Sequence, residues 1–180
     1  MAHLSPIVPS TPAPIRLHWN FEVKADQESV WREVSDTDRF NRVAGMEFEY
    51  SRQVGASGGQ RRIGRVRKFG LVLRWEEYAF DFESPHRYRV DRRFLNGPLS
   101  RYVVTLSLTP EDGHTRLDYQ IHAWPRNILT RPLMEIEFRG AVRRQLTRMW
   151  KRMVTHIEQG GGRLEPPVRP LDGSRRQLLE

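Results

Sequence analysis

The sequence predicts an α+β fold in which a curved, seven-stranded antiparallel sheet wraps around a long C-terminal helix, with two short helices after the first strand. Three observations predict this fold. Runs of alternating apolar and polar residues are separated by turn signals too short for helical crossovers, so the strands are expected to be antiparallel. Two short helical patterns interrupt these runs near the N-terminus. One long run with helical periodicity follows the last strand.

The first strand and the two short helices are expected within residues 17–45. The apolar members of the first strand alternate with polar residues: Leu17, Trp19, Phe21 and Val23. Asp26 is expected to cap the first helix, because its carboxylate can accept a hydrogen bond from a free N–H of the first turn. Asp36 or Thr37 can cap the second helix in the same way, and Gly45 is expected to end it.

Six further strand-like runs follow, separated by turn signals rich in glycine, proline and asparagine. They are Glu47–Val54, Arg61–Lys68, Leu71–Phe82, Tyr88–Leu95, Arg101–Thr109 and Thr115–Trp124. The alternation is clearest in the last two runs, where one face is expected to be buried and the other solvated. The residues of the two buried faces are Tyr102, Val104, Leu106 and Leu108, then Leu117, Tyr119, Ile121 and Ala123.

The long C-terminal helix is predicted from apolar residues that recur at helical spacing. They are Ile128, Leu129, Leu133, Ile136, Phe138, Val142, Leu146, Met149, Met153 and Ile157. Asn127 is a candidate cap, and Pro132 falls in an early turn, where a proline is tolerated best. Three consecutive glycines from Gly160 predict the end of this helix.

The two ends of the chain differ in composition from the region between them. Residues 1–14 are rich in proline and predict a disordered leader, and residues 160–180 predict a flexible tail rich in glycine and proline. The folded domain is therefore expected to span residues 15–159.

Composition excludes several classes of function. The 180 residues contain no cysteine, which excludes disulfides, Cys-ligated metals and thiol nucleophiles. No apolar run approaches the roughly 20 residues of a membrane helix, and the N-terminus lacks the features of a secretory signal. The sequence therefore predicts a cytoplasmic protein without a transmembrane segment.

The formal charge of +8 raises the question of an anionic partner. Basic residues are concentrated on the predicted long helix: Arg131, Arg139, Arg143, Arg144, Arg148, Lys151 and Arg152. Such a stripe can follow the phosphates of nucleic acid or of anionic lipid, but a solvated helix face is the more common interpretation. Nucleic acid is disfavoured as a partner, because the arginines lack interleaved aromatic residues and a recognised motif.

The polar residues form no clear catalytic or metal-binding motif. No two of the six histidines have metal-ligand spacing, so neither a metal nor another cofactor is predicted. Ser107, Asp118 and His122 could be drawn as a triad, but no nucleophile elbow accompanies them. Glu76 and Glu77 are adjacent in a strand and are expected to face opposite sides of the sheet.

Several short motifs resemble a known superfamily in their order and spacing. They are Val30-Trp31, Ser35–Asn41, Trp75-Glu76-Glu77, Tyr88-Arg89-Val90, Gly97-Pro98-Leu99 and Gly113–Leu117. This pattern resembles the SRPBCC superfamily, the START-like and polyketide-cyclase-like proteins with a helix-grip fold. More narrowly, it is similar to the START-like domain that precedes the catalytic domain of some bacterial adenylate/guanylate cyclases. The chain is too short to hold both domains, so the resemblance implies a stand-alone relative or an excised sensor half.

The resemblance implies a hydrophobic cavity between the curved sheet and the long helix. The candidate cavity residues lie on the predicted apolar faces: Trp75, Phe94, Tyr102, Tyr119, Met134 and Phe138. Core packing is the alternative role for each aromatic residue. Arg92 shares strand parity with Phe94, so it can point inward, where it would need Glu76, Glu77 or a ligand carboxylate as a partner. The alternative for Arg92 is an exposed side chain beyond a strand bulge.

Three functions are compatible with these residues. The first is non-catalytic binding of a small hydrophobic or amphipathic ligand, in a sensor or regulatory role. The second is a small cavity enzyme of the cyclase or dehydratase type, which would place a carboxylate or histidine beside a tyrosine in the cavity. The third is an electrostatic interaction module whose basic helix contacts a cyclase catalytic domain, another signalling partner, an anionic membrane or nucleic acid.

Overall fold

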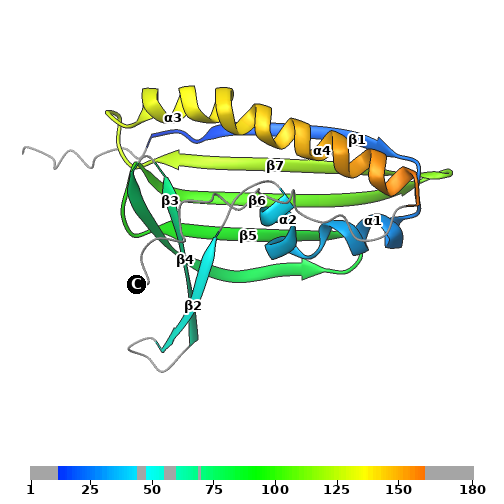
Figure 1. Cartoon of the computed structure of the whole chain (residues 1–180), viewed down its shortest axis with the longest axis horizontal. Helices are drawn as coiled ribbons and strands as arrows, with labels where there is room; N and C mark the ends of the chain where they lie inside the picture. The colour runs from blue at the N-terminus through cyan, green and yellow to red at the C-terminus, as the bar shows by residue number, and fades with distance from the viewer. Residues whose placement is uncertain (1–11, 44–47, 55–59, 69, 161–180) are drawn as a thin grey trace, which may run out of the picture.

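The computed structural model describes residues 12–43, 48–54, 60–68 and 70–160, and over these residues it has the predicted architecture. Seven antiparallel strands form one sheet in the order β1-β7-β6-β5-β4-β3-β2, and a long C-terminal helical segment crosses its concave face (Figure 1). The predicted glycine turn at 55–59, the predicted helix end at Gly45 and the terminal segments 1–11 and 161–180 lie outside the described residues. The α+β helix-grip fold is confirmed.

The strands pair as successive hairpins, with the first strand added beside the last. Their bounds are β1 Ile15–Val23, β2 Glu49–Val54, β3 Gln60–Lys68, β4 Leu71–Glu83, β5 Arg87–Phe94, β6 Leu99–Glu111 and β7 His114–Pro125. The register places Trp19 opposite Tyr119 and Trp75 opposite Phe94. Because side chains alternate between faces, this register brings the apolar residues of neighbouring strands to one concave surface.

The two short helices follow β1 and have the predicted caps. In α1 (Gln27–Val34), the Asp26 carboxylate accepts a hydrogen bond from the backbone N–H of Ser29 at 2.9 Å. In α2 (Thr37–Val43), the Asp36 carboxylate accepts from the backbone N–H of Arg39 at 2.9 Å, so Asp36 rather than Thr37 caps this helix. Figure 1 shows both helices beside the C-terminal half of the long helical segment.

The C-terminal segment is not one regular helix. It consists of α3 (Arg131–Glu137), a π-helical turn η1 (Phe138–Val142) and α4 (Arg143–Glu158). The candidate cap Asn127 was placed wrongly, since the helix begins only at Arg131. The Asn127 carboxamide oxygen instead accepts from the backbone N–H of Thr130 at 2.9 Å and closes a turn before the helix. The predicted end is confirmed at Gly160, whose φ of 64° favours glycine.

Four apolar residues that were assigned to the inward face of the helix lie in solvent instead. Ile128 is 69%, Leu129 85%, Leu133 52% and Ile136 74% exposed. Ile128 and Leu129 lie in the turn before the helix. The first turns of α3 carry two apolar stripes, and a helix on a sheet can bury only one of them. Met134 and Phe138 occupy the inward stripe, with 2% and 5% exposure.

An aromatic cluster fills one end of the space between sheet and helix. Tyr119 of β7 packs against Trp150 of α4 with ring centroids 4.9 Å apart, and Phe40 of α2 packs on Trp150 at 5.0 Å. Trp19 completes the cluster and donates from its indole N–H to the Thr147 hydroxyl at 2.8 Å. The filled end therefore lies under α4 and the short helices, which leaves the α3 end for the site.

Candidate functional site

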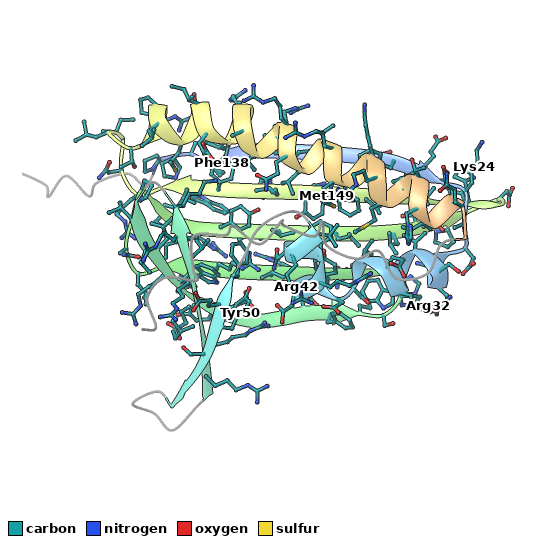
Figure 2. All side chains as sticks on the ribbon, viewed as in Figure 1. Lys24, Arg32, Arg42, Tyr50, Phe138 and Met149 are labelled. Atoms are coloured by element: carbon teal, nitrogen blue, oxygen red, sulfur yellow. The ribbon has the colours of Figure 1, made fainter. Side chains whose placement is uncertain are left out.

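A cavity of about 550 Å³ lies between the sheet and the α3–η1 segment. Its walls come from β2 to β6 on the sheet side and from α3, η1 and the start of α4 on the other side. Figure 2 shows Phe138, a residue of its wall, on the sheet-facing side of the helix. The π-helical turn carries two wall residues, Phe138 and Val142. Such turns are frequent at functional sites.

Six of the seven candidate residues line this cavity. They are Trp75, Arg92, Phe94, Tyr102, Met134 and Phe138. They come from β4, β5, β6 and the α3–η1 segment, so residues from four separate elements meet at one place. Their role in ligand binding stays a prediction.

Tyr119 is the candidate that does not line the cavity. Its side chain is 2% exposed and packs in the aromatic cluster with Trp19, Phe40 and Trp150. The alternation of apolar and polar residues predicted that Tyr119 lies on the concave face, and the structure has it there. However, the part of that face near Tyr119 is covered by α2 and α4, which fill the space with their own aromatic rings.

The apolar wall is built from aromatic pairs across neighbouring strands. Trp75 packs on Phe94 with ring centroids 5.6 Å apart and on Phe48 at 5.0 Å. Tyr102 packs on Phe138 of η1 at 6.1 Å, which closes the cavity between sheet and helix. Such a surface favours apolar rings or chains in a ligand.

Arg92 points inward and is held by a buried carboxylate. Arg92 is 5% and Glu77 8% exposed, and the Arg92 Nε donates to Glu77 at 2.9 Å. The Arg92 Nη2 donates to the Tyr50 hydroxyl at 3.1 Å, and that hydroxyl donates to Glu77 at 3.2 Å. The inward alternative for Arg92 is therefore the one found, with Glu77 rather than Glu76 as the protein partner.

A second arginine shares the same carboxylate from the other side. Arg62 of β3 lies 3.0 Å from Glu77 and donates to Asp38 of α2 at 2.7 Å. Its guanidinium lies over the Tyr50 ring at 3.9 Å from the centroid. Two arginines and two carboxylates thus balance in charge, and this balance helps to keep the buried Arg92 and Glu77 ionised.

Arg92 keeps one donor group for the cavity. Its Nη1 has no hydrogen-bond partner in the described part of the chain, and Arg92 is part of the cavity wall. Burial acts to lower the pKa of Arg92, but the neighbouring Tyr50 and Glu77 outweigh it and raise that pKa above its ordinary value. The cavity therefore contains a permanent cation with free N–H groups.

Tyr102 supplies a second polar group beside Arg92. Its hydroxyl has no hydrogen-bond partner among the described residues, and the Arg92 guanidinium lies 6.0 Å from its ring centroid. Burial raises the pKa of Tyr102 to about 12, so the hydroxyl stays protonated at neutral pH and can donate. The pKa values of Tyr88 and Tyr119 are raised by burial as well.

The other ionisable groups of the wall are two paired carboxylates, Lys68 and the exposed Arg67. Glu137 forms an ion pair with Lys68 at 2.6 Å, and Glu49 forms one with Arg65. No histidine lies in the part of the wall that the structure describes. In the same residues no cluster of three or more metal-ligating side chains is found, and no helix is long and apolar enough to cross a bilayer.

Sequence reasoning missed four residues that surround Arg92 and its carboxylate partner. These are Tyr50 of β2, Arg62 of β3, Asp38 of α2 and Phe48, which lies just before β2. One signal was available, because Phe48 and Tyr50 are two residues apart and share a face of the strand predicted at Glu47–Val54. No signal linked Arg62 or Asp38 to Arg92, since their proximity depends on how three separate elements meet.

Comparison with known proteins agrees with this geometry. A family model described as polyketide cyclase/dehydrase and lipid transport matches residues 15–158. No curated protein sequence matches significantly. Among solved structures, an aromatase/cyclase from a Streptomyces species aligns with a TM-score of 0.59 at 13% identity, over 83% of this chain and 99% of that one.

Two further solved structures are similar over nearly their whole length. A START superfamily protein from Mycobacterium smegmatis aligns with a TM-score of 0.52 at 13% identity, over 79% of this chain and 98% of that one. A conserved protein from Geobacillus kaustophilus aligns with a TM-score of 0.52 at 16% identity, over 82% and 98%. At such identities these similarities show the fold alone.

Proposed function

The chain belongs to the polyketide cyclase/dehydrase and lipid transport family, and from that premise we propose that it binds a small amphipathic ligand without transforming it. The observation that carries the proposal is the cavity of about 550 Å³, whose mainly apolar wall contains the guanidinium of Arg92, with an Nη1 that has no partner among the described residues. Cavities that hold drug-sized ligands are about 300–1,000 Å³ and are mainly apolar with a few polar groups. The cavity fits this description.

The polar groups favour a ligand with a carboxylate or carbonyl oxygen at one end. Arg92 Nη1 and the Tyr102 hydroxyl are both donors without a partner in the described residues. A buried donor gains most from an acceptor when no water competes for it. The aromatic wall of Trp75, Phe94 and Phe138 would then hold the apolar part of the same ligand.

Catalysis is the second candidate, and the family description and the aromatase/cyclase fold similarity support it. A cyclase or dehydratase needs a group that moves a proton, commonly a histidine or a carboxylate. Both carboxylates of the described wall are ion-paired, and Glu77 behind Arg92 is held by two arginines. These contacts favour binding over proton transfer. A regulatory role with a cyclase catalytic domain or another signalling partner stays a prediction.

Filling the cavity should remove ligand binding. We expect Val142→Phe to raise the Kd for the amphipathic dye anilinonaphthalene sulfonate about tenfold or more, because the added ring occupies space in the cavity. Val154→Phe is the matched control, since Val154 is partly buried on α4 but does not line the cavity. Dye fluorescence gives the Kd, and native mass spectrometry of the purified protein detects small molecules already bound. Equal Kd values for both variants would contradict the proposal.

Removing the Tyr102 hydroxyl tests the polar end of the cavity. Because this hydroxyl has no partner in the described protein, Tyr102→Phe should leave the free energy of unfolding nearly unchanged. The Kd for the anionic dye should nevertheless rise by up to about tenfold, the value of one hydrogen bond. Tyr119→Phe is the control, because Tyr119 is buried outside the cavity. If the control weakened binding as much as Tyr102→Phe, the assigned polar end would be wrong.

A further inference from the structure

Exposed apolar side chains are concentrated in the segments that border the α3 side of the cavity. Four of them, in α3 and the loop before it, form a surface that we name the apolar patch: Ile128, Leu129, Leu133 and Ile136. Leu71 and Val72 at the start of β4 and Leu95 after β5 are also exposed, at 56%, 43% and 54%. An exposed group of aliphatic residues of this kind is typical of an interaction site.

These segments belong to the same end of the molecule. The Asn96 side chain donates to the backbone carbonyl of Val72 at 2.8 Å, which joins the β5–β6 loop to the start of β4. Arg126, just before the apolar patch, donates to the carbonyl of Gly97 at 2.7 Å. Lys68 pairs with Glu137 at 2.6 Å across the cavity wall. Figure 1 shows α3 at the end of the sheet where β7 finishes.

A basic face continues from the apolar patch along the outer side of the same helical segment. It consists of Arg139, Arg144, Arg148, Lys151 and Arg152. All five are exposed, and none forms an ion pair with a described residue. Figure 2 shows nitrogen-tipped side chains projecting from the outer side of this segment. The basic face therefore attracts anions without internal compensation.

We propose that the apolar patch and the basic face together dock this protein on the surface of an anionic phospholipid bilayer. An amphipathic surface of this type places aliphatic side chains at the boundary between head groups and acyl chains, and its cations near the lipid phosphates. The four patch residues are aliphatic, so they suit acyl chains rather than stacking on nucleic-acid bases. Docking requires no ligand in the cavity, so it stands or falls separately from the proposed function.

Co-sedimentation with vesicles tests this docking surface. We expect the full chain to bind vesicles of phosphatidylcholine and phosphatidylglycerol in equal parts. Binding to pure phosphatidylcholine should be at least about tenfold weaker, because each basic residue near an anionic surface increases the affinity severalfold. Leu129→Ser combined with Ile136→Ser should weaken binding to the mixed vesicles about tenfold, because two buried aliphatic chains are lost. Arg144→Ser combined with Arg148→Ser should weaken it comparably and reduce its sensitivity to salt.

A matched charge control separates docking from general attraction. Arg16 and Arg89 are exposed on the convex face of the sheet, so Arg16→Ser combined with Arg89→Ser removes the same charge elsewhere. This control should bind the mixed vesicles as tightly as the unmodified protein does. All variants should unfold at the same thermal midpoint as the unmodified protein. Equal loss of binding in the control would overturn the proposal. So would binding to duplex DNA but not to vesicles, or a dimer in solution that the patch substitutions dissociate.

Discussion

Replacing Glu77 by leucine is expected to lower the free energy of unfolding by about 3–5 kcal/mol, the usual cost of removing one partner from a buried ion pair. Glu77 is the shared acceptor of Arg92 and Arg62, at 2.9 and 3.0 Å. Without it, the guanidinium of Arg92 stays buried, with the Tyr50 hydroxyl as its one hydrogen-bond partner among the described residues. Urea denaturation followed by circular dichroism measures the change.

Two further variants separate the buried pair from an ordinary surface carboxylate. Glu49→Gln removes an exposed ion pair with Arg65 and should cost at most about 1 kcal/mol. In the double variant Glu77→Leu with Arg92→Met, both charges are gone, so it should be more stable than Glu77→Leu alone by about 1 kcal/mol or more. If Arg92→Met gave no such recovery, the two charges would not be coupled in the folded protein.

The strands and their faces could be predicted because the alternation is locally encoded. The parity of Tyr88, Val90, Arg92 and Phe94 placed Arg92 on the inner face, and the structure puts it there. Both Glu76 and Glu77 were left open as its partner, although Glu77 shares the strand parity of Trp75, which was expected to face the cavity. The register between β4 and β5 places Glu77 opposite Arg92.

The long helix was harder to predict because periodicity shows which residues share a face but not which face is covered. Leu129, Leu133 and Ile136 have the same spacing as an inward stripe, yet Met134 and Phe138 take that position. The π-helical turn at Phe138–Val142 has no sequence signature that was recognised. Because the turn changes the rotation of the helix, it decides which of its residues line the cavity.

The site could be predicted in part, for a similar reason. Strand parity selects the concave face, so it identified Trp75 and Tyr102, which line the cavity, together with Tyr119, which does not. The difference arises because Phe40 and Trp150, from distant segments, cover Tyr119. Which part of a concave face is filled is a property of the assembled elements rather than of one strand.

The close contact between Gly64 of β3 and Trp75 of β4 leads to the second large effect. The two residues are directly opposite in the sheet, and a Cβ at position 64 would lie 2.2 Å from Cε2 and Cζ2 of the indole. Trp75 is 1% exposed, and its indole N–H has no hydrogen-bond partner among the described residues. Packing alone therefore fixes the ring, and it requires a glycine across the strand.

Gly64→Ala should lower the free energy of unfolding by about 1–3 kcal/mol, because the added methyl group overpacks the contact with the indole. The indole also forms part of the cavity wall, so its displacement should weaken dye binding as well. Gly140→Ala is the opposite control: nothing lies within 4 Å of a Cβ there, and alanine in a helix should be neutral or stabilising by up to about 1 kcal/mol. Combining Gly64→Ala with Trp75→Phe should recover part of the loss, since the smaller ring makes room for the methyl group. If the Gly64→Ala protein were as stable as the original, the indole would be free to move. The cavity wall at Trp75 would then rearrange to accommodate the added methyl group.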